Sequence, residues 1–391
     1  MKELARITET FTESVIREMT RICDDLGGYN LSQGFPDFES PKAIKLAAIK
    51  AIAEDYNQYP VTFGEPELRE AVARKAGSYN KIQCDADTMV TVTCGATEAM
   101  IATLKAIINP GDEIIVFEPF YENYGPDGIL SGATPRYVTL YAPEWKYNMD
   151  ELRAAFNNKT KAIVINTPNN PTGKVFSREE LQEIAELCQK WDAYVITDEI
   201  YEHILYDGVE HVSMASLEGM AERTITINGA SKTYSVTGWR IGWAIASPAI
   251  TKRIRKVHDF LTVGAPTPLQ IAVAQAIDEF DESYYTGLIT HYTKAREYIY
   301  GALAGIGFDV IKPQGAYYYL ATIPQELMKK YGAKNDFEFA VNMIKKTKVA
   351  SVPGQSFYMG EGKGTNQVRF CYCKNWDTLK TVKKLLEDAS R

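Results

Sequence analysis

Seven short runs of β-forming residues recur between residues 89 and 246, and helical patterns separate them. Strands that alternate with helices form a largely parallel sheet with helices on both faces, because each helix returns the chain to the edge where the next strand begins. The runs are apolar, which is typical of strands buried on both faces. The expected strands are Met89–Thr93, Glu113–Phe117, Arg136–Leu140, Ala162–Asn166, Ala193–Thr197, Thr224–Ile227 and Ile241–Ala246.

Two of the intervening segments carry clear helix signals. We expect helices at Glu98–Ile108 and Ser177–Trp191. Ser177 stands three residues before Glu180, and this spacing is typical of a capping box at a helix N-terminus.

The pattern changes in the last third of the chain. A helical pattern runs from Thr267 to Leu303, and the segments Ala316–Ala321 and Gln367–Cys373 after it look antiparallel. This change predicts a second, smaller α+β domain, because a chain of 391 residues exceeds what one hydrophobic core usually serves. We assign residues 41–280 to the large domain, and residues 1–40 together with 281–391 to the small one.

Composition and charge exclude several classes of protein. With 45% hydrophobic and 24% charged residues, the chain has the composition of an ordinary globular protein. Its formal net charge of -7 argues against nucleic acid or an anionic membrane as the main partner. No apolar stretch approaches the roughly 20 residues of a membrane span, and residues 1–30 lack the pattern of a secretion signal. We therefore expect a cytoplasmic protein.

The cysteines and histidines predict neither a disulfide framework nor a metal site. Six cysteines are too few for such a framework in a chain of this length. Cys371 and Cys373 stand two residues apart, but no second pair or nearby histidine completes a set of ligands. The four histidines show no ligand spacing, so we predict that no metal is bound.

Polar side chains follow three of the expected strands at the point where each strand ends. Asn170 comes after the fourth strand, and Asp198 and Tyr201 come after the fifth. Lys232 comes after the sixth. Ligands bind beyond the carboxyl ends of the strands in an open parallel sheet, so these four side chains are expected to converge on one crevice.

Two further segments predict anion binding near that crevice. Arg240 stands eight residues after Lys232, just before an apolar strand, where a buried charge needs an anionic partner. Gly95, Ala96 and Thr97 link the first strand to a helix, and the free N–H groups of such a helix N-terminus bind phosphate.

With these motifs the chain resembles the class I/II aminotransferases of fold type I, a family that uses pyridoxal 5′-phosphate and includes aspartate, aromatic and kynurenine aminotransferases. The likeness extends from Ser32-Gln-Gly-Phe-Pro36 to Val368-Arg-Phe370. It implies the fold of pyridoxal-phosphate-dependent transferases, with a mostly parallel seven-stranded sheet, helices on both of its faces and a smaller α+β domain.

The resemblance assigns roles around the cofactor ring. It implies that Lys232 bonds covalently to the cofactor and that Asp198 is the partner of the pyridine nitrogen. Tyr201 and Asn170 would donate hydrogen bonds to the ring oxygen O3′, and Tyr121 would stack on the ring. An ionised Asp198 keeps the pyridine nitrogen protonated, and the freed amine of Lys232 can carry a proton as general base and acid.

The resemblance also implies residues that hold the cofactor phosphate, namely Gly95, Ala96, Thr97, Ser231 and Arg240. Many relatives have a hydroxyl three residues before the lysine, where this chain has Gly229, so either the Ser231 hydroxyl or the Gly229 backbone completes the phosphate site. Tyr59 would reach the phosphate of a neighbouring subunit, which implies a homodimer with shared active sites.

Arg369 matches the arginine that binds the substrate α-carboxylate, with the Gly34 backbone and Asn170 assisting. A guanidinium meets a carboxylate through two parallel hydrogen bonds and so fixes the substrate's orientation. The implied activity is transfer of an amino group between an L-amino acid (aromatic, aspartate or other) and a 2-oxo acid, with 2-oxoglutarate as the expected acceptor, by a ping-pong mechanism. Such an enzyme belongs to amino-acid metabolism or biosynthesis.

Other activities compete with this interpretation. A pyridoxal-phosphate lyase of the same fold, acting by C–S cleavage or β-elimination, would use the same cofactor contacts. A catalytically idle binding domain is disfavoured because Lys232 and Arg369 are both present. A nicotinamide enzyme is disfavoured because no G-x-G-x-x-G motif follows an early strand.

Overall fold

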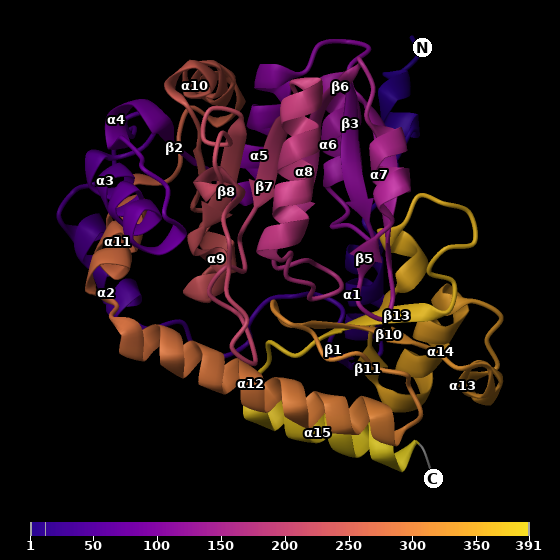
Figure 1. The fold of residues 1–391 in the computed structure, drawn as a ribbon. Helices are drawn as coiled ribbons and strands as arrows, with labels where there is room; N and C mark the ends of the chain where they lie inside the picture. Colours follow the sequence, from indigo (N-terminus) through magenta and orange to yellow (C-terminus); the bar gives the residue numbers. More distant parts are fainter. Residues whose placement is uncertain (1, 12, 390–391) are drawn as a thin grey trace.

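The computed structural model describes residues 2–11 and 13–389, and its centre is a sheet of eight strands within those residues (Figure 1). The strand order is β2-β9-β8-β7-β6-β3-β4-β5, and all strands except β5 and β9 run in one direction. The strands are β2 (Val90–Thr93), β3 (Glu113–Glu118), β4 (Thr134–Tyr141), β5 (Lys146–Tyr147), β6 (Thr160–Asn166), β7 (Tyr194–Asp198), β8 (Thr224–Gly229) and β9 (Gly242–Ile245).

All seven expected strands are present, and the expected fold class is confirmed with two differences. The eighth strand, β5, forms an edge of only two residues, which is too short to show an alternating pattern. Strand β9 lies antiparallel to both of its neighbours. The chain between β8 and β9 contains only short helical turns, whereas a parallel return needs a crossover, usually through a longer helix.

Helices cover both faces of this sheet because its buried strands are apolar on both sides. Ile114 and Val116 of β3 pack with α5, α6 and α10, whereas Ile115 and Phe117 pack with α7 and α8. The expected capping box of Ser177 is present at the start of α8. These helices are α5 (Ala96–Ile107), α6 (Tyr124–Ser131), α7 (Met149–Ala155), α8 (Arg178–Trp191) and α10 (Pro248–Thr262).

A group of helices packs beside the β2 edge of the sheet. Helix α11 contacts both α2 and α3, and their apolar side chains form one core with β2 and β9. The helices are α2 (Lys42–Ala53), α3 (Pro66–Lys75), α4 (Ala86–Met89) and α11 (Thr267–Glu279), and short helical turns lie at α9 (Ala230–Thr233), η1 (Arg6–Glu9), η2 (Ala76–Asn80), η3 (Met214–Ser216), η4 (Thr237–Trp239) and η5 (Gly354–Phe357).

The C-terminal part forms two small sheets with their own helices. Strand β13 lies antiparallel to β10, as expected, and it also pairs antiparallel with β12. Strand β1 pairs with β11 in parallel. The strands are β1 (Tyr29–Asn30), β10 (Tyr318–Thr322), β11 (Val349–Ala350), β12 (Val352–Pro353) and β13 (Gln367–Cys371). The helices are α1 (Val15–Asp25), α12 (Glu282–Gly305), α13 (Gln325–Tyr331), α14 (Asp336–Thr347) and α15 (Trp376–Asp388).

The expectation of one helical run from Thr267 to Leu303 is wrong. The run breaks between α11 and α12, where Phe280 is extended and the side chain of Asp281 accepts a hydrogen bond from the Ser283 N–H. Asp281 therefore starts a new helix. In Figure 1, α12 starts near α2 and runs along the lower part of the molecule, where α15 lies alongside its later half.

We propose the two-domain division expected from the sequence, with residues 41–280 in one domain and residues 1–40 and 281–391 in the other. The pairing of β1 with β11 supports it, because this pairing joins the N-terminal segment to the C-terminal part. Among the described residues, no helix is long and apolar enough to cross a membrane.

Candidate active site

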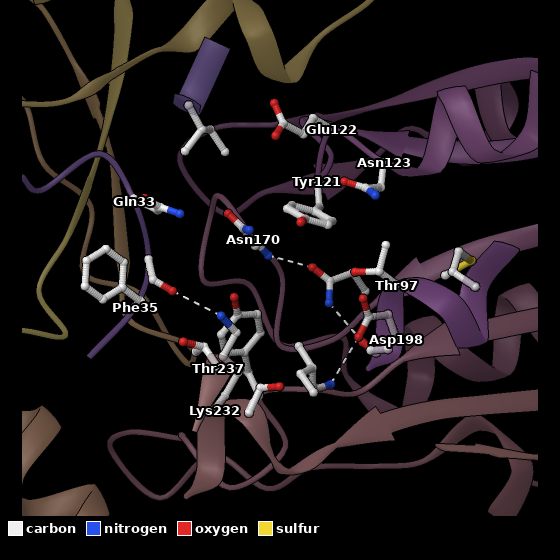
Figure 2. A pocket seen from close by; sticks show the side chains of 18 of the residues that line it. Gln33, Phe35, Thr97, Tyr121, Glu122, Asn123, Asn170, Asp198, Lys232 and Thr237 are labelled. Carbon is white, nitrogen blue, oxygen red and sulfur yellow. Dashed lines mark hydrogen bonds between the residues drawn. The ribbon is translucent and has the colours of Figure 1, made fainter. Parts of the chain in front are cut away.

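A cavity of about 520 Å³ lies where the carboxyl ends of β6, β7 and β8 face strand β13 (Figure 2). Of the residues predicted for the site, all but Gly95 and Tyr59 line it. Figure 2 shows Glu122 and Lys232 at opposite ends of this space. The predicted residues that line it are Gly34, Ala96, Thr97, Tyr121, Asn170, Asp198, Tyr201, Ser231, Lys232, Arg240 and Arg369.

Lys232 lies in the short turn that follows β8. Its Nζ donates a hydrogen bond to the Gly34 carbonyl, 3.0 Å away. Burial, together with the nearby charges of Arg240 and Arg369, lowers the pKa of Lys232 to about 8. This amine is therefore more readily uncharged near neutral pH than that of an ordinary lysine, and an uncharged amine can act as a nucleophile or a base.

Asp198 ends strand β7, and it is buried among neutral partners. Its Oδ2 accepts a hydrogen bond of 2.8 Å from the Tyr124 hydroxyl, and its Oδ1 accepts one of 3.2 Å from the Ile200 N–H. Burial raises the pKa of Asp198 above its ordinary value, although the Tyr124 hydrogen bond and the charge of Lys232 act in the opposite direction. A buried carboxylate without a salt bridge to a described residue is suited to a cationic ligand.

Arg369 extends from β13 and is 1% exposed. It donates to the Asn170 Oδ1 at 2.8 Å and to the Ser32 carbonyl, and its guanidinium lies 4.5 Å from the ring centre of Tyr318. All of these partners are neutral, and Nε has no partner among the described residues. A buried guanidinium without a counter-ion is suited to a carboxylate.

The N-terminus of α5 and Arg240 form a corner of the cavity that is suited to an anion. The first N–H groups of a helix have no acceptor within it, and here they belong to Ala96 and Thr97. Gly95 has a φ of 84°, and a side chain at this position would overlap the guanidinium of Arg240. Ser231 lines the same cavity, whereas Gly229 does not line it.

Three tyrosines take part in the site although the sequence did not predict them. Tyr124 binds Asp198, and the Tyr318 hydroxyl lies 3.0 Å from that of Tyr201. Tyr317 donates to the Gly34 carbonyl that Lys232 also contacts. Only the run of tyrosines at 317–319 stands out in the sequence, and that run indicates a strand.

One group of potential metal ligands lies outside the cavity. Ligand atoms of Glu199, Glu202 and His211 lie within 4.8 Å of one another. Lys75 already forms a salt bridge with Glu202, and Ser213 donates to Glu199, so other contacts occupy these carboxylates. That no metal is bound stays a prediction.

The cavity therefore combines an amine, a buried carboxylate, a corner suited to an anion and a second buried cation. This donor set fits a phosphorylated pyridine aldehyde, because the corner suits its phosphate, Asp198 suits its protonated ring nitrogen and Lys232 suits its carbonyl carbon. The family model for aminotransferase class I and II matches residues 27–386. The chain belongs to this family.

Relatives and solved structures agree with this assignment. Human kynurenine–oxoglutarate transaminase 3 is 36% identical, over 98% of this chain and 89% of its own length. The structure of N-succinyldiaminopimelate aminotransferase from Mycobacterium tuberculosis is 35% identical, with a TM-score of 0.93, and the match covers 99% of this chain and 100% of the other. Aspartate aminotransferase from Thermus thermophilus with maleate is 29% identical, with a TM-score of 0.89 and full coverage of both chains.

The family assignment fixes the class of reaction. The protein is an aminotransferase that depends on pyridoxal 5′-phosphate and moves an amino group between an amino acid and a 2-oxo acid. These relatives and structures are aminotransferases, so the lyase alternative is not favoured. When bound, the cofactor supplies an electron sink for the carbanion that forms when the α-proton leaves.

Proposed function

We propose that Lys232, Asp198 and Tyr201 are the catalytic residues of this aminotransferase, and that Lys232 is the residue to which the cofactor bonds. The observation that carries the proposal is the lowered pKa of Lys232, about 8, in the same cavity as the carboxylate of Asp198. The Nζ of Lys232 would act as the general base that takes the α-proton of the amino donor, and the resulting ammonium would act as the general acid that returns a proton. Asp198 keeps the ring nitrogen protonated.

Further residues of the cavity hold the cofactor in this proposal. Gly95, Ala96, Thr97, Ser231 and Arg240 bind the phosphate, and Tyr121 stacks on the ring. Tyr201 and Asn170 donate to the ring oxygen. The support is their position around one cavity, where Gly95 forms the N-cap of α5.

Arg369 binds the α-carboxylate of the amino donor in this proposal, with the Gly34 backbone and Asn170 beside it. It is buried and has no acidic partner among residues 2–11 and 13–389, which supports this role. We propose 2-oxoglutarate as the amino acceptor and aromatic or other uncharged amino acids as donors at least as good as aspartate. The human relative at 36% identity is named for kynurenine and oxoglutarate, which supports an aromatic donor and this acceptor.

Replacement of Arg369 by alanine is expected to raise the KM of every amino donor by a similar factor, because all donors share the α-carboxylate. Loss of a bidentate charge-assisted pair costs about 3 kcal/mol, or roughly 100-fold in kcat/KM. The measurement is kcat and KM for aspartate, glutamate, phenylalanine, tyrosine and kynurenine with 2-oxoglutarate. In the wild type, the same panel tests the donor range.

Two variants control for stability in this test. Arg369→Lys keeps the buried charge but cannot form the bidentate pair, so it should recover melting temperature more than it recovers KM. Arg21→Ala removes an exposed arginine that pairs with Glu13, and it should leave KM unchanged. A loss confined to acidic donors would move Arg369 to the side-chain end of the pocket.

We also propose a homodimer in which Tyr59 reaches the active site of the neighbouring subunit. Tyr59 is 87% exposed and does not line the cavity of its own chain. Apolar side chains of α2 are also exposed, and Phe260 of α10 is 90% exposed, so these side chains are candidates for an interface. We further propose a cytoplasmic location, which the six free cysteines support. We also propose a role in amino-acid metabolism or biosynthesis, which the names of the relatives support.

Two inactive chains should restore each other's activity if Tyr59 serves the neighbouring site. In a mixed dimer of Lys232→Ala and Tyr59→Asp, one site carries both changes and the other carries neither. Random reassociation makes about half of the dimers mixed, so activity should recover to roughly a quarter of wild type. The measurement is the activity after joint dissociation and reassociation, with each variant treated alone as the control. Absence of recovery despite demonstrated subunit exchange would contradict the shared site.

A further inference from the structure

His258 is a buried histidine outside the cavity, on the inner face of α10. It is 0% exposed, and oxygen atoms lie at hydrogen-bond distance from both of its ring nitrogens. Nδ1 lies 2.7 Å from the Glu98 Oε1, and Nε2 lies 2.6 Å from the Thr62 carbonyl oxygen. These two oxygens belong to segments that are far apart in the sequence.

The two contacts together define the protonation state of the ring. The Thr62 carbonyl can only accept a hydrogen bond, so Nε2 must carry a proton. Glu98 accepts the Cys94 N–H and the Thr262 hydroxyl as well as facing His258, which is the pattern of a carboxylate that only accepts. Burial raises the pKa of Glu98, but these hydrogen bonds outweigh it and lower that pKa. Both nitrogens of His258 therefore donate, and the ring is an imidazolium.

Glu98 connects this imidazolium to the turn that precedes α5, which we name the phosphate turn (residues 94–97). Glu98 lies in the first turn of the helix, and its Oε2 accepts the Cys94 N–H at 2.5 Å. Its Oε1 also accepts the Thr262 hydroxyl at 2.6 Å. The carboxylate thus holds the first residue of the phosphate turn and His258 at the same time.

Thr62 belongs to the segment that carries Tyr59, which we name the Tyr59 loop (residues 58–64). The Thr267 hydroxyl donates to the Gln58 carbonyl at one end of the loop, and Phe63 lies 3.9 Å below the guanidinium of Arg255 at the other. The contact of His258 with Thr62 lies between these two anchors, three residues from Tyr59. His258 therefore connects the Tyr59 loop directly to Glu98.

We propose that the imidazolium of His258 is a positioning residue that holds the Tyr59 loop against the phosphate turn. This inference rests on the proposed roles of Tyr59 and of residues 95–97. A single charged ring would then set the position of two phosphate-binding segments, one that serves its own active site and one that serves the neighbouring site. A neutral ring has one N–H and can hold only one of the two segments.

The groups around His258 determine how this link depends on pH. Glu98 faces it from α5, the Thr62 carbonyl faces it from the Tyr59 loop, and Asp259 is the acidic neighbour on its own helix. Burial would lower the pKa of His258, but the hydrogen bond and charge of Glu98 outweigh it and raise that pKa above its ordinary value. The stabilisation is therefore present at low pH and is lost as pH rises through the raised pKa.

The test is hydrogen–deuterium exchange of the Tyr59 loop in the dimeric holoenzyme, compared between wild type and His258→Gln at the same pH. The result is the ratio of the two proteins' exchange rates at each pH, in which the intrinsic exchange rate of the amides cancels. We expect the wild-type loop to exchange about tenfold more slowly at about pH 6, as a charge-assisted hydrogen bond implies, and the two proteins to converge by about pH 9. His291→Gln removes a histidine elsewhere and should match wild type throughout.

A ratio of one throughout, or a constant ratio over the whole pH range, would overturn the proposal, since a merely structural role is independent of pH. A second measurement needs no variant of His258. The chain has four histidines, so ¹⁵N-histidine spectra of the wild type, assigned by replacing the other three in turn, should show His258 protonated on both nitrogens at about pH 7. A neutral His258 there would also overturn it.

Failure of the proposed function would look different. If Tyr59 does not serve the neighbouring site, mixed dimers will stay inactive while the exchange of the Tyr59 loop still depends on His258. If His258 does not position the loop, mixed dimers will recover activity while the exchange ratio stays flat. The two results therefore separate the two proposals.

Discussion

Replacement of Lys232 by alanine is expected to abolish transamination, with a loss of at least about 10,000-fold, while the fold is retained. The amine that bonds to the cofactor and the base that moves the α-proton are lost together. The cost to stability should be small, because the hydrogen bond from Nζ to the Gly34 carbonyl is partly replaced by the Tyr317 hydroxyl, which donates to the same oxygen.

The measurement is kcat with saturating donor and 2-oxoglutarate, together with the melting temperature of the cofactor-free protein. Lys252→Ala removes an exposed lysine of α10 and serves as the matched control, with wild-type values expected for both. A Lys232→Ala enzyme that transaminates within about tenfold of wild type would remove Lys232 from the mechanism.

Replacement of Asp198 by asparagine should reduce kcat by about 1,000-fold or more and leave the cofactor bound. The amide has nearly the shape of the carboxylate and can still accept the Tyr124 hydroxyl, but it carries no charge to keep the ring nitrogen protonated. The charge itself is the quantity under test.

Stability gives this variant a second readout. Burial raises the pKa of Asp198 in the cofactor-free fold above its value in the unfolded chain. Ionisation of Asp198 at neutral pH therefore lowers the free energy of unfolding. The cofactor-free Asp198→Asn protein should therefore be as stable as wild type or more stable. Tyr124→Phe removes the hydrogen bond and keeps the charge, so its loss of kcat should be about tenfold or less. Equal losses in both variants would make Asp198 a structural residue.

Most of the sheet could be predicted from the sequence because its strands are buried on both faces and so appear as apolar runs. The direction of β9 could not be predicted, since direction depends on the connection and not on the run itself. The break at Phe280 and Asp281 was missed because no glycine or proline marks it. A capping aspartate inside a helical pattern looks like an ordinary exposed residue.

Lys232 and Asp198 were predictable because they stand at or just after the ends of strands, where a charge is conspicuous. Arg369 lies in the middle of β13, and only the resemblance to the family indicated its role. Tyr124 and Tyr318 were missed because a tyrosine in a helix or strand resembles a core aromatic. The contact of Tyr124 with Asp198 joins residues 74 positions apart. Such a pairing depends on how the strands are ordered in space, which spacing along the chain does not encode.

Helix α12 has a mechanical consequence for the enzyme. It is 24 residues long, or about 36 Å, and its first turn is tied to the turn of Lys232 by a hydrogen bond of 2.7 Å from Tyr284 to the Thr233 carbonyl. Its other end packs against α15. A tilt of about 10° about the first turn would displace the far end of such a rod by about 6 Å. Any tilt of the helix about its first turn would therefore be amplified at α15, far from the turn that carries Lys232.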